Sequence, residues 1–285
     1  MSVDAISAFI RALSFIALFQ AAGVAIFVVI FGRRLKQASR PIRALGFASA
    51  SAAVVLVFGH YALEAARMAG AMSGAFDMSL QQLVLDSSMS TAWGMRTAGL
   101  LMLAIAIGRD ELLWDVLSIG GAALAIAAFL FVGHTSTHSG RVWLAALLSV
   151  HLAVVAFWFG SLLPLHVVSR REDAGVAADL IDQFSRIAIW LVPGIFVAGL
   201  VLAIVLVSRW AVLREGYGLL LLAKVTGFAA LMMLAALNKW RYGPALRTSP
   251  GAASLFQRAL TIEYVVICAV LSATAVMTTF FSPET

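Results

Sequence analysis

Four of the five histidines lie in one segment, from Phe131 to His166, that is otherwise apolar and aromatic. They are His134, His138, His151 and His166. Imidazole nitrogen is a good ligand for copper, zinc, iron and nickel. A polar ring in a hydrocarbon-facing segment costs free energy unless it has a partner, so each histidine is a candidate for function. The segment predicts the end of one membrane helix, a short polar turn and a second complete helix.

The fifth histidine, His60, precedes Glu64 by four residues and Met68 by eight. Side chains four residues apart lie on nearly one face of a helix. At a rise of about 1.5 Å per residue, His60 and His151 are expected at similar depths below the same membrane surface. Several methionines fall near that surface, and thioether is a soft ligand that selects Cu(I). We therefore predict a copper site whose ligands come from His60, His151, His134, His138, Glu64, Met68, Met72 and Met89.

Other interpretations of these residues remain open. A lone histidine in a membrane helix often only hydrogen-bonds a neighbouring helix, and methionine commonly fills gaps in apolar cores. Glu64 could form an ion pair with Arg96 instead of orienting a metal ligand. Paired histidines on adjacent helices also hold b-type haem, and His60 with His151 or His134 could do so. A third possibility is a sensor or assembly factor that binds copper without transporting it.

The composition is that of an integral membrane protein. The 285 residues are 62% hydrophobic and 12% charged, against about 45–50% and about 25% in soluble domains. The net charge of +6 therefore reports membrane topology and not nucleic-acid binding. One cysteine, Cys268, excludes an internal disulfide and any CxxC metal motif. Neither a phosphate-binding GxxxxGK[ST] loop nor a DKTG sequence is present, so we expect no ATP-driven pump and no enzyme.

The apolar runs predict an all-α membrane protein with a bundle of eight transmembrane helices. A helix needs about 20 apolar residues to cross the bilayer. The runs are Ser7–Phe31, Ile42–Met68, Ser88–Ile107, Trp114–Gly133, Val142–Leu165, Ile187–Ser208, Gly218–Leu237 and Ile262–Phe281. The longest connections, about 169–186 and 238–261, are short and polar and leave no room for a soluble domain. We expect a single transmembrane domain over residues 1–285.

Lysine and arginine predict the orientation of the bundle. The loops after the first, fifth and seventh runs are basic, and the alternate loops hold far fewer basic residues. The basic loops contain Arg33, Arg34, Lys36, Arg40, Arg43, Arg170, Arg171, Arg186, Lys239, Arg241, Arg247 and Arg258. By the positive-inside rule these loops face the cytoplasm and both termini lie on the periplasmic side. The histidines and methionines of the predicted site then lie in the outer half of the membrane.

Several motifs resemble the copper resistance protein D (CopD) family of bacterial inner-membrane proteins with eight helices. They are GHTSTH at 133–138, HLAVVAFWFGSLLPL at 151–165 and NKWRYGPAL at 238–246, followed by Glu263 and Pro283. The resemblance covers the second half of the chain well and the first half only by its helix count. Of the predicted ligands, His134, His138 and His151 lie in the matched motifs.

The resemblance implies a role in copper homeostasis. Family members are thought to move a copper ion, Cu⁺ or Cu²⁺, across the inner membrane toward the cytoplasm. They often work with a periplasmic copper-binding partner of the CopC type, which is fused to some relatives. This sequence carries no such domain, so the resemblance implies a separate partner or none.

Overall fold

A computed structural model of the chain describes residues 2–109, 111–132, 140–206, 216–247 and 251–281, and within these residues it is helical without strands. Its long helices are α1 (Val3–Phe31), α2 (Ser39–Ala69), α4 (Ser88–Ala106), α5 (Leu112–Ala127), α7 (Arg141–Arg171), α8 (Ala174–Leu206), α9 (Gly216–Leu237) and α11 (Ala252–Phe280). Its short elements are η1 (Gly32–Arg34), η2 (Met72–Phe76), α3 (Met78–Leu85), η3 (Ala128–Phe131), the π-helix η5 (Asn238–Tyr242) and α10 (Gly243–Ala245).

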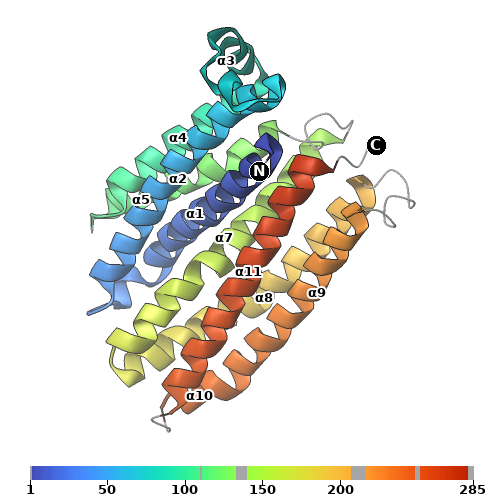
Figure 1. The fold of residues 1–285 in the computed structure, drawn as a ribbon. Coiled ribbons are helices and arrows are strands. Elements are labelled where there is room, and N and C mark those ends of the chain that lie inside the picture. Colours follow the sequence, from blue (N-terminus) through green and yellow to red (C-terminus); the bar gives the residue numbers. More distant parts are fainter. Residues whose placement is uncertain (1, 110, 133–139, 207–215, 248–250, 282–285) are drawn as a thin grey trace.

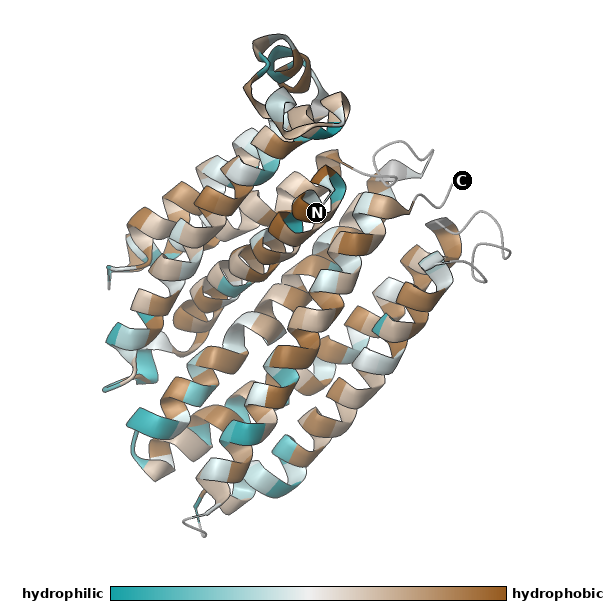
Figure 2. Ribbon diagram, viewed as in Figure 1, coloured by the Kyte–Doolittle hydropathy of each residue, from teal (hydrophilic) through white to brown (hydrophobic). Residues whose placement is uncertain are grey.

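Seven helices of the described chain are long and apolar enough to cross a membrane. They confirm an all-α protein with several membrane-spanning helices. The predicted third run, Ser88–Ile107, forms α4, which is not among the seven. The first half of α4 is polar and includes Arg96. Many large apolar side chains are exposed, as a lipid environment favours, and hydrophobic residues predominate along the long helices (Figure 2).

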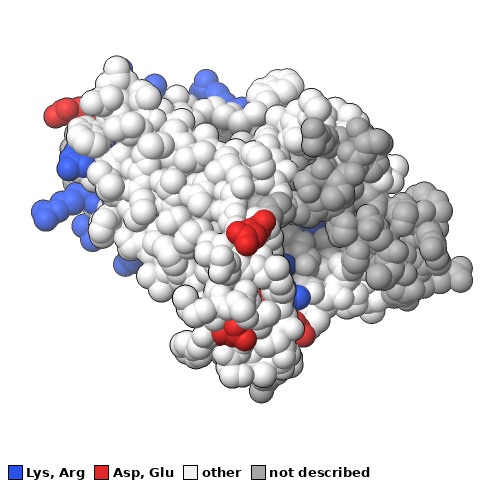
Figure 3. Space-filling view, turned by 90° about the horizontal axis from the view of Figure 1, so that it is seen from above, with Lys and Arg blue, Asp and Glu red and all other residues white. Residues whose placement is uncertain are grey.

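Helix α1 forms the centre of the bundle. It packs against α2 and α5 on one side and against α7 and α11 on the other (Figure 1). Ala21, Val24 and Ala25 of α1 have no exposed surface. Both termini lie at one end of the bundle and α10 lies at the other (Figure 1). Figure 3 views the molecule from above: Lys and Arg gather along one edge, and most of the described surface in this view carries no charge.

Two glycines bring α1 and α7 into backbone contact. A Cβ atom on Gly23 would lie 2.0 Å from the carbonyl oxygen of Ala156, and one on Gly160 would lie 2.4 Å from the Cα of Gly23. The Gln20 side chain donates a hydrogen bond of 3.0 Å to the Gly160 carbonyl at the same crossing. Small residues permit this close approach of membrane helices, and the crossing joins α1 closely to α7.

A buried carboxylate joins α7 to the start of α2. Glu172 Oε1 accepts hydrogen bonds of 2.8, 2.9 and 2.9 Å from the backbone N–H groups of Lys36, Gln37 and Ala38. The three N–H groups belong to the N-cap of α2 and the two residues before it, so the carboxylate lies near the positive end of the helix dipole, where it is stabilising. The contact holds the basic loop after α1 against the end of α7.

Helices extend into two of the predicted connections between membrane runs. The expected polar connection at 169–186 is almost entirely helical, because α7 continues to Arg171 and α8 begins at Ala174. Residues 238–261 hold a π-helix, a short helix and the first turns of α11. Charged residues in those turns hid the helices from a count of apolar residues, because a helix can extend beyond the membrane.

Candidate metal site and polar clusters

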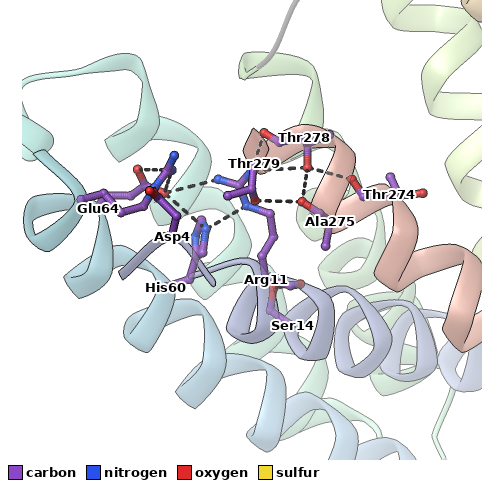
Figure 4. A network of polar contacts seen from close by, with 10 residues as sticks. Asp4, Arg11, Ser14, His60, Glu64, Thr274, Ala275, Thr278 and Thr279 are labelled. Atoms are coloured by element: carbon purple, nitrogen blue, oxygen red, sulfur yellow. Dashed lines mark hydrogen bonds and ion pairs between the residues drawn. The ribbon is translucent and has the colours of Figure 1, made fainter. Parts of the chain in front are cut away.

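His60 lies in a charged cluster between α1 and α2 (Figure 4). Arg11 of α1 donates from Nε to His60 Nε2 at 2.9 Å and from Nη2 to Glu64 Oε1 at 3.3 Å. His60 Nε2 and Glu64 Oε1 are themselves 3.3 Å apart, which confirms that the two side chains share one face of α2. A further Arg11 hydrogen bond, of 2.9 Å to the Thr278 carbonyl, ties the cluster to α11.

Arg67 completes this cluster at the end of α2. It contacts both oxygens of Glu64 at 3.2 Å and Asp4 Oδ1 at 2.8 Å. We call Asp4, Arg11, His60, Glu64 and Arg67 the outer cluster. Within it two arginines face two carboxylates, so the formal charges balance without a metal ion.

The ion pair between Glu64 and Arg96, which the sequence left open, does not form in the structure. Glu64 pairs with Arg11 and Arg67, and the Arg96 guanidinium lies 4.2 Å from the centre of the Phe129 ring. That arrangement is a cation–π contact. Arg11 was missed by the sequence argument because it lies 49 residues before His60 in another helix, and only the packing of α1 against α2 brings the two together.

The outer cluster limits how His60 could bind a metal. Its Nε2 lone pair accepts the Arg11 hydrogen bond, and the guanidinium is permanently charged. A copper ion could reach Nε2 only if Arg11 moved away. Among the residues described here, no three His, Cys, Asp or Glu side chains form a group that could hold a metal ion. His134 and His138 lie outside the described residues.

His151 has a different environment, on α7 against α8. Its Nδ1 lies 3.1 Å from the Ile195 carbonyl, and because a carbonyl can only accept, Nδ1 carries the proton. The ring lies beside Gly199 of α8, where an added Cβ would be at an ordinary contact distance of 3.4 Å from His151 Cε1. Nε2 therefore keeps its lone pair. A backbone carbonyl that fixes the tautomer in this way is typical of metal-binding histidines.

The predicted methionine ligands lie near the end of α2. Met68 and Met72 are about half exposed, and Met89 lies partly buried in the first turn of α4. The structure thus brings His60 and Glu64 into contact, and Met68 follows Glu64 by one turn of α2. His151 contacts α8 instead. The ammonium group of Lys224 on α9 exerts an electrostatic effect on His151 and disfavours a positive charge on its ring.

One buried polar group was not among the predicted site residues. Asn238 Nδ2 donates to Glu263 Oε1 at 2.5 Å, and the two residues are 7% and 2% exposed. They line a cavity of about 180 Å³ between α7, α8, η5 and α11. An acidic residue within the last apolar run was the available signal in the sequence, and it was used only as part of a family motif.

Comparison with known proteins places the chain in a family. Residues 1–144 match the model of the copper resistance protein D-like N-terminal domain, and residues 178–277 match that of copper resistance protein D. The chain is 27% identical over 215 residues to copper resistance protein D of Pseudomonas syringae pv. tomato, covering 69% of each chain. No solved structure matches it. The chain belongs to the copper resistance protein D family, and the matches extend the expected resemblance to its first half.

Proposed function

We propose that this protein carries copper ions across the bacterial inner membrane, from periplasm to cytoplasm. Its family implies a role in copper resistance, and its helices are apolar enough to span a membrane. With eight crossings, α4 included, the basic loops at the α10 end would face the cytoplasm. Both termini, η2 and α3 would then face the periplasm.

The observation that carries the proposal is which ring nitrogen of His151 carries the proton. Its Nδ1–H donates to the Ile195 carbonyl, so the Nε2 lone pair is available inside the bundle. In the proposed orientation, His151 lies ten residues from the outer start of α7, a depth of about 15 Å at 1.5 Å per residue. That is far enough from the outer surface for an ion bound there to have entered the membrane.

The remaining proposed ligands would pass copper from the outer surface to His151. His134 and His138, with Met68, Met72 and Met89, would capture copper at the periplasmic face, where a separate CopC-type protein could deliver it. His60 and Glu64 would join the ligand set only when Arg11 releases His60 Nε2. The chain holds no nucleotide motif, so the membrane potential, worth ~2.3 kcal/mol per charge per 100 mV, would drive uptake.

The test compares two histidines on the same helix. His151→Ala should abolish tight copper binding by purified protein, whereas His166→Ala, near the inner end of α7, should leave it unchanged. Copper stoichiometry and affinity are measured for both variants beside a thermal unfolding curve. Wild-type affinity in His151→Ala would remove His151 from the site.

A flux measurement then separates transport from binding alone. Proteoliposomes that contain the wild-type protein should take up copper under an imposed potential without ATP, and His151→Ala proteoliposomes should not. Tight binding without uptake would favour a sensor or assembly factor. A Soret absorption band in the purified protein would favour the haem alternative.

A further inference from the structure

A π-helix presents Asn238 to the last membrane helix. At the end of α9 the backbone widens into η5, where the Gly243 N–H donates to the Asn238 carbonyl five residues earlier. Single π turns in α-helices frequently occur at functional sites. Here the turn directs the Asn238 side chain at α11, where its Nδ2 lies 2.5 Å from Glu263 Oε1. The contact is buried and lies two to three turns into α11.

The partners of Glu263 are all neutral. Besides the Asn238 amide, the Trp158 indole of α7 lies within hydrogen-bonding reach of the carboxyl group. No ion pair to Glu263 forms within the described part of the chain. An ionised carboxylate buried among apolar helices without a cation is costly. The neutral acid does not carry this cost.

Asn238 has a buried oxygen that the neutral acid could satisfy and the ionised one could not. Its Oδ1 is buried and has no hydrogen-bond partner, although Nδ2 of the same amide contacts Glu263. An ionised carboxylate offers only acceptors, so it cannot donate to Oδ1. A protonated Glu263 has an O–H group, and an acid and an amide side by side can exchange two hydrogen bonds.

The cavity gives this pair a connection toward one end of the bundle. Its walls come from α7, α8, the end of α9, η5 and α11, and they are apolar apart from Ser185, Asn238, Lys239 and Glu263. Lys239 is the charged group that shares the wall with Glu263, and α7, α8 and α9 add no acid or base to it. Lys239 and the exposed Trp240 belong to the basic end of the bundle.

We propose that Glu263 is a proton-binding site that exchanges its proton, through this cavity, with the aqueous side at which Lys239 lies. The carboxylate gains one proton and becomes a neutral acid whose O–H donates to Asn238 Oδ1. Release returns the proton to that side and leaves the carboxylate hydrogen-bonded to the Asn238 amide. Intramembrane carboxyl groups serve as proton relays in pumps and transporters. The site rests on the geometry of η5 and α11, so it can hold or fail independently of copper transport.

Carbodiimide labelling tests the protonation directly in the wild-type protein. Dicyclohexylcarbodiimide enters apolar sites and modifies protonated carboxyl groups, and peptide mass spectrometry locates the adduct. Glu263 should be labelled near neutral pH. Glu64, held by two arginines, and Glu172, held by three backbone N–H groups, are matched buried carboxylates that should stay unlabelled. Labelling of Glu64 or Glu172 with Glu263 unmodified would overturn the proposal.

Infrared spectroscopy supplies a second measurement that needs no reagent. The carbonyl stretch of a protonated carboxyl group should be present in the wild-type spectrum and absent in that of Glu263→Gln. In oriented proteoliposomes, this band should decrease when the pH is raised on the Lys239 side and persist when it is raised on the other side. Identical carboxyl regions in the two proteins from about pH 5 to about pH 9 would show that Glu263 binds no exchangeable proton.

Discussion

The two halves of the chain differ in whether their buried charged groups form ion pairs. In the first half, Arg11, Glu64 and Arg67 lie in one connected cluster, and each charge meets an opposite one within 3.3 Å. In the second half, Glu263 contacts a neutral amide and lines a cavity. Lys224 of α9 is partly buried and forms no ion pair with any described residue.

This difference separates a structural role from an ion-handling role. A connected set of opposite charges stabilises itself, and adding an ion to it means breaking existing contacts. An isolated buried carboxylate gains free energy when a cation or a proton arrives, and an isolated ammonium does so when an anion arrives or its own proton leaves, because the charge is otherwise uncompensated. The comparison therefore favours helix attachment as the resting role of the outer cluster, and it agrees with the ion chemistry that we propose for the second half, where His151 also lies. Arg96, set against Phe129, is the exception in the first half.

The same substitution at the two buried glutamates should produce the largest contrast. Glu64→Gln leaves Arg11 and Arg67 without their shared carboxylate, and breaking a buried pair in this way costs about 3 kcal/mol. If Glu263 is protonated as we propose, Glu263→Gln replaces a neutral acid by an amide of the same shape that can still donate to Asn238, so it should cost less than about 1 kcal/mol.

Thermal unfolding in one detergent measures both variants. The midpoint should fall clearly for Glu64→Gln and stay near that of the wild type for Glu263→Gln. Equal losses would mean that Glu263 is ionised and structurally paired, and the comparison between the two halves would not hold.

The helices and their order could be predicted from the sequence, but their polar contacts could not. Apolar runs identify membrane helices because every backbone group in lipid must bond within its own segment. The approach of Arg11 to His60 depends on the packing of α1 against α2, and the Asn238–Glu263 contact depends on a π turn. Neither contact produces a periodic pattern in the sequence. The pairing of His60 with Glu64 was predictable because both belong to one helix at a spacing of four.

Removing an isolated cation near His151 should have an intermediate effect. Lys224 repels a positive charge at His151, so Lys224→Met should raise copper affinity on the order of tenfold, or about 1.4 kcal/mol. Lys239→Met removes a cation from the Glu263 cavity instead and should leave the affinity unchanged. Copper titration of both variants makes the comparison. A lower affinity in Lys224→Met would mean that the lysine serves the copper site, for example by holding an anionic ligand.

An exposed ion pair should show the smallest effect and serve as the reference for the others. Arg186 and Asp182 form a hydrogen-bonded pair one turn apart on α8, with side chains 75% and 51% exposed. Water already solvates both groups, so exposed pairs contribute about 0.5 kcal/mol or less. Asp182→Asn should therefore shift the unfolding midpoint very little, in contrast to Glu64→Gln, which removes the same type of charge from a buried cluster. If Asp182→Asn destabilised the protein as much as Glu64→Gln, burial would not explain the stability of the outer cluster, and its role in joining α1 to α2 would need another cause.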